Sequence, residues 1–231
     1  MNVCIIPARG GSKRIPHKNS KDFCGKPMLA YAIATAQASQ LFAQIYVSTD
    51  DDTIAAIAQA YGAQIIARPA ALADDHATTV AVIRHAIDAL ALSPTTNVCC
   101  LYPCTPLLPA SVLVESLASW QQSGSLYCMP VLAFTTNILR ALKLKQNHQL
   151  ASVFSQHEQT RTQDLPQAYH DAGQFYWAKA ATWQVQASIH NHALGVVLPK
   201  HSVVDIDDVA DWQFAEAVYR LRHGVNDARF N

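Results

Sequence analysis

Short apolar runs alternate with stretches of helical character along most of the chain, and this alternation limits the possible folds more than any other feature. Each run has the length of a β-strand and is rich in apolar residues. The runs span residues 3–7, 44–48, 64–67, 97–101, 125–132 and 194–198. Their order predicts an α/β protein in three layers, a mostly parallel sheet flanked by helices.

Helices are expected between these runs. Pro27 suits the first turn of an alanine-rich helix that continues to Ala38. Acidic residues at 50–52 suit the start of the next helix, because a helix N-terminus carries partial positive charge. Apolar residues three or four positions apart indicate further helices. These lie at 82–90, 110–122 and 209–222.

The length of 231 residues fits one well-filled core, so we predict a single domain over 1–231. The strand and helix pattern loosens at 134–168, where Gln, His and Thr are frequent and apolar residues are scattered. We expect this segment to leave the sheet and to form a surface for homodimerisation. Packing back onto the protein's own sheet is an equal alternative.

The composition restricts the kinds of partner. The chain has 17 Lys and Arg against 17 Asp and Glu, so its formal charge is zero and indicates neither a nucleic-acid nor a membrane partner. The apolar runs are too short to cross a membrane. Six cysteines lack the spacing of a zinc site or a redox pair. We therefore expect a cytoplasmic protein with reduced, buried cysteines.

Charge is unevenly distributed along the chain. Residues 1–26 hold six Lys or Arg and one Asp, whereas residues 201–217 hold five Asp or Glu and no Lys or Arg. A basic loop and an acidic segment suit a phosphate ligand that carries a divalent metal. A solvated loop and an ordinary acidic helix start explain the same charges equally well.

The basic loop directly follows the first strand. From residue 8 it reads ARGGSK, which has neither the spacing of a Walker A loop nor that of a dinucleotide fingerprint. Adjacent glycines let backbone N–H groups approach an anion closely. Arg9, Lys13 and Lys18 can add charge-assisted hydrogen bonds. The loop therefore predicts a polyphosphate site, with a solvated basic turn as the alternative.

Several separated motifs together resemble one family, the cytidylyltransferases that activate nine-carbon acidic sugars such as sialic acid. The first motif is IPARGGSK at 6–13 with Lys18 and Asn19 after it, and others follow in the family's order and approximate spacing. They are Gly25-Lys26-Pro27-Met28, Arg68-Pro69, the segment 75–79 and Asp205-Ile206-Asp207. The resemblance covers residues 3–219 and is weakest at 134–168. It implies a Rossmann-like fold of the nucleotide-diphospho-sugar transferase type.

The resemblance also implies roles for individual residues. Those implied to bind CTP are Ala8, Arg9, Gly10, Gly11, Ser12, Lys13, Lys18, Asn19, Arg68, Ala77 and Thr79. For Arg68 the alternative is an ordinary surface arginine, and for Thr79 a helix cap.

Two acidic residues are implied to bind the cofactor, Mg²⁺. Asp205 and Asp207 stand two positions apart, so in an extended chain both carboxylates face the same way and can converge on one cation. A helix cap at Asp207 or Asp208 is the alternative. The implied catalytic residues are Arg9, Lys18, Asp205 and Asp207, the two cations offsetting charge on the departing pyrophosphate.

Departures from the family pattern concern the sugar. Sialic-acid activators typically continue the central strand with QPTSPLR, whereas this chain reads YPCTPLL from Tyr102. This tyrosine, with the segments 170–177 and 205–212, looks like the branch acting on pseudaminic acid, a bacterial nonulosonate used to glycosylate flagellin and other surface structures. The implied sugar contacts are Tyr102, Asp171, Gln174 and Tyr176. A strand in the core followed by a turn is the alternative for the last three.

The implied reaction is attack by the anomeric hydroxyl of a nine-carbon 2-keto sugar acid, pseudaminic acid by preference, on the α-phosphate of CTP. The products are the CMP-sugar and pyrophosphate. Three alternatives stay open: the same reaction on N-acetylneuraminate, nucleotidyl transfer to a sugar 1-phosphate, and a nucleotide-binding regulatory module without catalysis. The pair Asp205 and Asp207 argues against the last of these.

Overall fold

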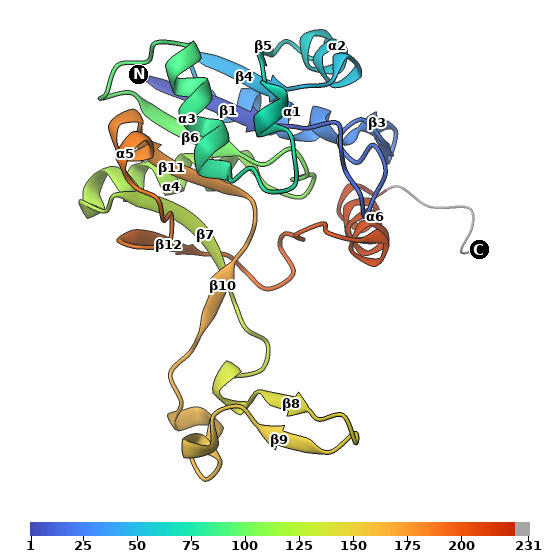
Figure 1. Ribbon diagram of the computed structural model, residues 1–231, viewed down its shortest axis with the longest axis vertical. Coiled ribbons are helices and arrows are strands. Elements are labelled where there is room, and N and C mark those ends of the chain that lie inside the picture. Colours follow the sequence, from blue (N-terminus) through green and yellow to red (C-terminus); the bar gives the residue numbers. More distant parts are fainter. Residues whose placement is uncertain (225–231) are drawn as a thin grey trace.

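A computed structural model describes residues 1–224 of the chain (Figure 1). Its centre is an eight-stranded sheet with the order β10-β7-β11-β6-β1-β4-β5 and with β12 also paired to β7. The strands of this sheet are β1 (Asn2–Pro7), β4 (Gln44–Thr49), β5 (Gln64–Ala67), β6 (Asn97–Leu101), β7 (Tyr127–Ala133), β10 (Tyr169–Asp171), β11 (Phe175–Lys179) and β12 (Ala193–Val197). The predicted α/β class is confirmed.

Most neighbouring strands are parallel. β1 pairs in parallel with β4 and β6, β4 with β5, and β7 with β12. β11 is antiparallel to both β6 and β7, and β10 is antiparallel to β7. The sheet is therefore mixed, because the chain returns through β11 between two strands that run in the same direction.

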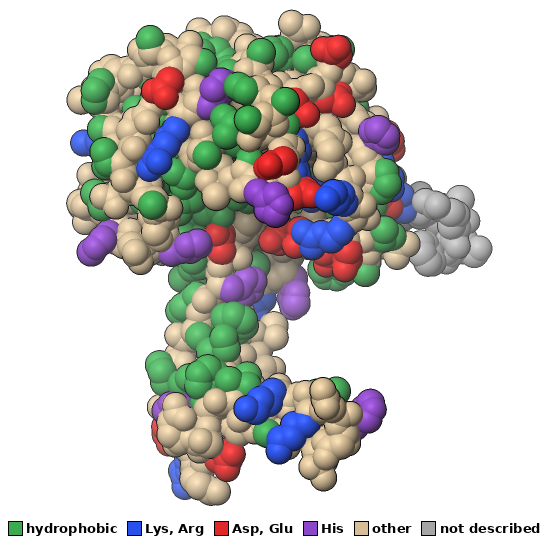
Figure 2. All heavy atoms as spheres, viewed as in Figure 1, with side chains coloured by type: hydrophobic (Ala, Val, Ile, Leu, Met, Phe, Trp, Pro, Cys, Tyr) green, Lys and Arg blue, Asp and Glu red, His purple; other side chains and the backbone are tan. Residues whose placement is uncertain are grey.

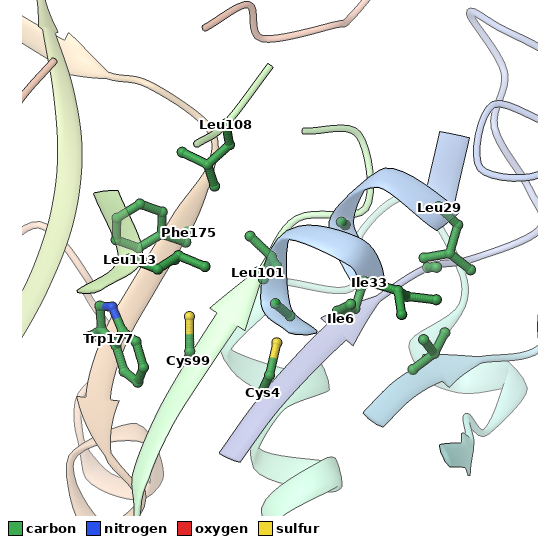
Figure 3. Packing of buried hydrophobic residues seen from close by; sticks show 14 of the residues in the cluster. Cys4, Ile6, Leu29, Ile33, Cys99, Leu101, Leu108, Leu113, Phe175 and Trp177 are labelled. Atoms are coloured by element: carbon green, nitrogen blue, oxygen red, sulfur yellow. The ribbon is translucent and has the colours of Figure 1, made fainter. Parts of the chain in front are cut away.

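Helices cover both faces of the sheet. The helices are α1 (Met28–Ala38), α2 (Asp52–Ala60), α3 (Thr79–Ala89), α4 (Ala110–Ser123), α5 (Ala180–Val185) and α6 (Val209–His223). Alternate residues of β1 point to opposite faces. Cys4 and Ile6 join a core with α1, α2 and α4 (Figure 3), whereas Val3 and Ile5 join a core with α3 and α5. The three predicted layers are thus present.

Helix starts follow local chemistry. Asp51 caps α2, its side chain accepting a hydrogen bond from the Ile54 N–H at 2.9 Å. Pro27 is the residue before α1 rather than its first residue. The short helix α5 was not predicted, since six residues are too few to show a helical period.

Residues 134–168, which we call the arm, project from the sheet (Figure 1). The arm contains a hairpin of β8 (Leu142–Leu144) and β9 (Leu150–Ser152), with the single-turn helices η2 (Ile138–Arg140), η3 (Ser155–His157) and η4 (Thr162–Asp164). Its apolar side chains Leu142, Leu144 and Leu150 are 58%, 65% and 61% exposed. The alternative in which these residues pack back onto the sheet is therefore wrong.

Two smaller elements lie beside the first strand's loop. A hairpin of β2 (Asp22–Phe23) and β3 (Lys26–Pro27) packs through Phe23 against Trp212 and Tyr219 of α6. The single-turn helix η1 (Ala70–Leu72) follows β5. In the described part of the chain, no helix is long and apolar enough to cross a membrane.

Candidate active site

A cleft of about 360 Å³ opens beyond the carboxyl ends of β1, β5 and β6. Ligands of open parallel sheets bind at this edge. The cleft is lined by eleven of the residues proposed from sequence: Arg9, Ser12, Lys13, Lys18, Asn19, Arg68, Ala77, Thr79, Tyr102, Asp205 and Asp207. The fold thus brings together segments that are up to almost two hundred residues apart.

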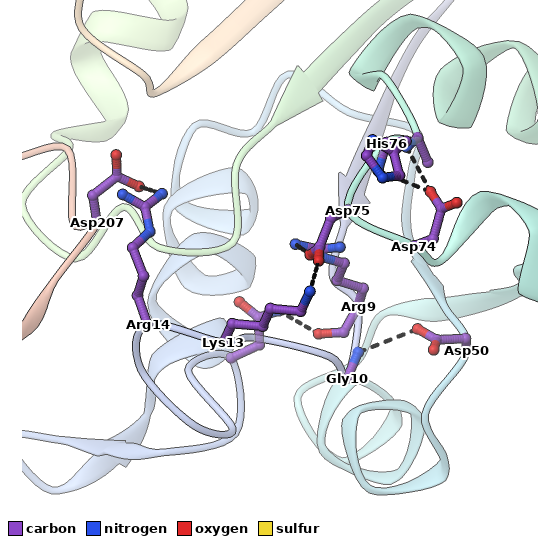
Figure 4. A network of polar contacts seen from close by, with 11 residues as sticks. Arg9, Gly10, Lys13, Arg14, Asp50, Asp74, Asp75, His76 and Asp207 are labelled. Carbon is purple, nitrogen blue, oxygen red and sulfur yellow. Dashed lines mark hydrogen bonds and ion pairs between the residues drawn. The ribbon is translucent and has the colours of Figure 1, made fainter.

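The basic loop supplies converging cations on one side of the cleft (Figure 4). The Arg9 guanidinium lies 2.7 Å from one oxygen of Asp75, and the Lys13 ammonium pairs with the other. Hydrogen bonds from Lys13 and Arg9 hold the pKa of Asp75 below its usual range. Two cations that converge on one carboxylate have the arrangement needed to hold a phosphate.

The same loop reaches the acidic segment near the end of the chain. The Arg14 guanidinium donates to Asp207 at 2.8 Å, and the Lys18 ammonium donates to the Ile206 carbonyl at 2.6 Å. Asp208, rather than Asp207, caps α6 by accepting from the backbone N–H groups of Ala210 and Asp211. The Asp207 carboxylate is therefore left facing the cleft.

Three residues of the loop do not line the cleft. Ala8 is buried, and the Gly10 N–H donates to Asp50 at 3.2 Å, so it is not directed at a ligand. A Cβ on Gly10 would lie 2.6 Å from an oxygen of Asp51, the cap of α2. Close packing against this cap accounts for a glycine at position 10. Gly11 has open space around it.

Asn19 lines the cleft but exposes little of its surface. It is 5% exposed, and its side-chain amide donates to the Arg9 carbonyl at 2.9 Å. Its side-chain oxygen accepts from the Cys104 thiol at 3.4 Å. Burial raises the pKa of Cys104 to about 11, so this thiol is not prepared as a nucleophile. Asn19 therefore fixes the backbone that carries Arg9.

Arg68 is a buried cation in the cleft wall, only 8% exposed. It donates to the Ser48 carbonyl at 2.5 Å and to the Ser48 hydroxyl at 3.2 Å. Burial lowers its pKa to about 10. No carboxylate forms an ion pair with it within residues 1–224. The description as an ordinary surface arginine is wrong, and the buried guanidinium favours an electron-rich ligand.

Part of the cleft lining is less polar. Leu72, Ala77, Val82 and Tyr102 contribute to it. Thr78 caps α3, so the interpretation of Thr79 as the cap is wrong. The Thr79 hydroxyl instead lies 2.9 Å from the Tyr102 hydroxyl. Burial raises the pKa of this tyrosine to about 12, which keeps its proton available for hydrogen bonding.

The sequence proposed three further sugar contacts, none of which lines the cleft. Tyr176 is 4% exposed, and its hydroxyl donates to Asp171 at 2.5 Å. Gln174 is 1% exposed and donates to the carbonyls of Ala172, Gly173 and Val204. The structure therefore places both side chains in the core behind the cleft rather than on its lining.

A bulge in the sheet places the segment before Gln174 and Tyr176 against Asp205, the first residue of the acidic pair. β10 and β11 lie along the same edge of β7 but are interrupted at residues 172–174. Gly173 there has φ +63°, and an added Cβ would lie 2.7 Å from the Asp205 carboxylate carbon. Only glycine fits this close approach without displacing Asp205.

Asp205 and Asp207 have the chemistry of a site for a hard cation. Burial, then the charge of Asp207, raises the pKa of Asp205 to about 6. In the described residues no cluster of three or more His, Cys, Asp or Glu is arranged for a metal. Two carboxylates fit Mg²⁺, which keeps several waters and takes substrate phosphates as its other ligands.

Sequence reasoning assigned no role to Arg14, Asp75 or Gly173, all of which line the cleft. Arg14 was visible as one of several cations in the basic loop. Asp75 lies in a motif shared with the family, whereas nothing in the sequence around Gly173 marks its contact with Asp205.

Comparison with known proteins identifies the family. The sequence model described as Cytidylyltransferase matches residues 3–222. The chain belongs to the cytidylyltransferase family. It is 40% identical over 226 residues to the pseudaminic acid cytidylyltransferase of Campylobacter jejuni serotype O:2, covering 96% of this chain and 97% of that protein.

Other cytidylyltransferase relatives match in different ways. A Helicobacter pylori protein named pseudaminic acid cytidylyltransferase and UDP-2,4-diacetamido-2,4,6-trideoxy-beta-L-altropyranose hydrolase is 36% identical over 216 residues, which cover 91% of this chain and 40% of that protein. The solved structure of a CMP:2-keto-3-deoxy-manno-octonic acid synthetase complexed with CTP has a TM-score of 0.69 at 17% identity, with 96% and 99% of the two chains covered. The similarity to this solved structure concerns the fold alone. The family resemblance and the Rossmann-like fold are confirmed.

Proposed function

We propose that this cytidylyltransferase transfers CMP from CTP to the anomeric hydroxyl of pseudaminic acid, giving the CMP-sugar and pyrophosphate. The observation that carries the proposal is the 40% identity to a pseudaminic acid cytidylyltransferase along almost the whole chain. The cleft supports it, since its cations, buried arginine and acidic pair suit a nucleoside triphosphate with a metal.

The charges of the cleft orient the nucleotide. The triphosphate lies against Arg9, Lys13 and Lys18, where phosphate oxygens replace the Asp75 carboxylate as the anionic partner of Arg9 and Lys13. The nucleoside then extends along the less polar wall of Leu72, Ala77, Val82 and Tyr102. Arg68 and Thr79 offer polar contacts to it.

Asp205 and Asp207 would hold Mg²⁺ on the triphosphate. When bound, the metal neutralises phosphate charge and lowers the pKa of the attacking hydroxyl. The side chains of this protein contribute by holding the reacting groups in position and by offsetting charge. Arg9 and Lys18 offset charge on the departing pyrophosphate, and Arg14 holds Asp207 in place. Catalysis by such a site is positioning and charge stabilisation, without a covalent intermediate.

The sugar occupies the part of the cleft between Tyr102 and the acidic pair. Tyr102 contacts it directly, whereas Asp171 and Tyr176 act behind the cleft wall. Five of the six free cysteines are buried, which suits a reducing compartment, and we place the enzyme in the cytoplasm. Its product would supply glycosylation of flagellin or other surface structures.

The choice of sugar is tested by measuring pyrophosphate release from CTP and Mg²⁺ with pseudaminic acid and N-acetylneuraminic acid in parallel. We expect a kcat/KM at least about tenfold higher for pseudaminic acid, because contacts that strengthen in the transition state set the preference. A higher value for N-acetylneuraminic acid would favour a sialic-acid activator. Release only with a sugar 1-phosphate would refute transfer to a keto acid, and CTP binding without release for any sugar would indicate a regulatory module.

We also propose that the arm forms a homodimer. A two-stranded hairpin is marginally stable by itself in water, so the β8–β9 hairpin needs another surface to cover it. Hydrophobic side chains cover much of the visible neck between the arm and the sheet (Figure 2). A second copy supplies a self-complementary apolar surface by two-fold symmetry.

Replacing Leu142 and Leu150 with aspartate is expected to convert the dimer into a monomer, because charge would be buried at the contact. Light scattering coupled to gel filtration would measure the mass. Lys143→Asp, in the same exposed hairpin, is the matched control and should leave the dimer intact. A wild-type monomer, or a dimer that survives the double substitution, would contradict the proposal.

A further inference from the structure

Asp205 lies against the bulge at residues 172–174, through contacts at its side chain and at its backbone. Gly173 approaches so closely that an added Cβ would lie 2.7 Å from the Asp205 carboxylate carbon. The Gln174 side-chain amide donates at 3.4 Å to the carbonyl of Val204, the residue before Asp205. The position of the Asp205 carboxylate therefore depends on the conformation of the bulge.

Backbone hydrogen bonds fix the residues on both sides of Gly173. The Ala172 N–H donates to the Pro130 carbonyl of β7 at 3.0 Å. The Gln174 carbonyl accepts from the N–H of Tyr102, the residue after β6, at 2.8 Å. Gly173 itself is buried, and the extra residue of a bulge is left unpaired by the strand ladder. Its N–H therefore needs an acceptor other than a neighbouring strand.

A side chain supplies this acceptor. Asp171 ends β10 and is paired with Val131 of β7, so strand pairing fixes its backbone. One oxygen of its carboxylate accepts from the Gly173 N–H at 2.8 Å. The other oxygen accepts from the Tyr176 hydroxyl at 2.5 Å and lies 3.4 Å from a ring nitrogen of His190. The two oxygens thus have different partners, and the first one holds the bulge.

We propose that Asp171 is a positioning residue for the metal site. Its hydrogen bond to the Gly173 N–H keeps the bulge in the conformation against which Asp205 lies, so the Asp205 carboxylate is in place before a cation arrives. Hydrogen bonds that hold the ligands of a metal in place strengthen its binding. This inference rests on the proposed function, since it requires Mg²⁺ at Asp205 and Asp207.

The charge of Asp171 offers a second way to affect the metal. A carboxylate near Asp205 would attract a cation through space. Burial and Asp207 are the larger causes of the raised pKa of Asp205, and the charge of Asp171 adds to them. Asparagine separates the two effects, because its side-chain oxygen can accept from the Gly173 N–H without carrying a charge.

The test compares Asp171→Ala with Asp171→Asn in the absence of sugar. Titration calorimetry gives the Kd of CTP with EDTA and with saturating Mg²⁺, and the ratio of the first Kd to the second measures what the metal contributes. We expect this ratio to fall about tenfold in Asp171→Ala, the lower end of the effect of removing a group that orients a metal ligand. Asp171→Asn should keep the ratio within about threefold of the wild-type value.

Two further variants accompany the test. Asp171→Leu keeps a side chain of similar size without an acceptor, so it should lower the ratio as alanine does and replaces alanine if that variant does not fold. His190→Ala is the matched control, because it removes an exposed partner of the other Asp171 oxygen and leaves the bond to Gly173 intact. It should keep the wild-type ratio. Thermal unfolding would check that each variant folds.

An unchanged ratio in Asp171→Ala or Asp171→Leu would overturn the inference. So would an equal loss of CTP affinity with and without Mg²⁺, which indicates a merely structural role. A fall in Asp171→Asn as large as in Asp171→Ala would show that charge, rather than the hydrogen bond, matters.

The wild-type protein separates failure of the inference from failure of the proposed function. A wild-type ratio near one would refute the proposed Mg²⁺ site together with the inference. If the wild type binds CTP more tightly with Mg²⁺ and releases pyrophosphate, but the ratio does not depend on Asp171, only the inference fails.

Discussion

Replacing Asp205 with asparagine is expected to lower pyrophosphate release on the order of 1000-fold, the largest effect of any single substitution considered. Asparagine has nearly the same shape, so the segment around it should keep its conformation. The lost charge is the reason for the effect, because Asp205 and Asp207, both in the cleft lining, are the carboxylates that we propose as Mg²⁺ ligands.

A thermal unfolding series separates metal binding from damage to the fold. Burial and the neighbouring Asp207 raise the pKa of Asp205, so its ionised form is disfavoured in the protein by itself. Asp205→Asn should therefore unfold at the wild-type temperature or slightly above it. Mg²⁺ with CTP should raise the unfolding temperature of the wild type by more than that of the variant. An equal rise, or near-normal turnover, would refute the assignment of Asp205 as a metal ligand.

Arg9→Ala is expected to lower kcat/KM for CTP by about 100- to 1000-fold, the range found when one donor to a developing charge is removed. The Asn19 side-chain amide donates to the Arg9 backbone carbonyl, and Asp75 pairs with the Arg9 guanidinium. Arg9 is therefore positioned before a ligand arrives. Preorganisation of this kind makes a charge contact more effective in the transition state. Initial rates of pyrophosphate release at several CTP concentrations would measure the loss.

The control for Arg9 is Lys200→Ala, which removes an exposed cation outside the cleft. It should leave kcat/KM within about twofold of the wild-type value, since a distant exposed charge is screened. Near-normal turnover in Arg9→Ala would contradict the proposed triphosphate contact. A loss of the same size in both variants would show that net charge, rather than position, matters.

The core of the fold could be predicted because each element carries its own local pattern. The strands β1, β4, β5 and β6 and the helices between them follow from apolar runs and helical spacing. The structure of the aromatic segment at 169–177 was harder to predict from the sequence. It reads as one strand, but the structure divides it into β10 and β11 around a bulge. The bulge depends on pairing with β7 and on contact with Asp205, neither of which a local pattern records.

The cleft residues were predictable only in part. Arg9, Lys18 and the acidic pair stand out by charge, and the resemblance to the family selected Arg68 and Thr79. The sequence did not show that Gln174 and Tyr176 are buried outside the cleft lining, because an aromatic and polar segment has the same sequence whether it lines a cleft or supports one. Burial decides between the two, and burial depends on neighbours that are distant in sequence.

The sequence by itself determined the α/β class, the basic character of the first loop, and the family. These follow from periodicity, local charge and ordered motifs, all of which are properties of neighbouring residues. Only the tertiary structure decided that Arg14 and Lys18 contact the segment of Asp205 and Asp207. It also decided that Gly173 lies against Asp205 and that the Tyr176 ring packs against the Tyr102 ring. Such contacts arise when the sheet places the ends of separate strands at one edge, and their distances depend on packing that no local pattern encodes.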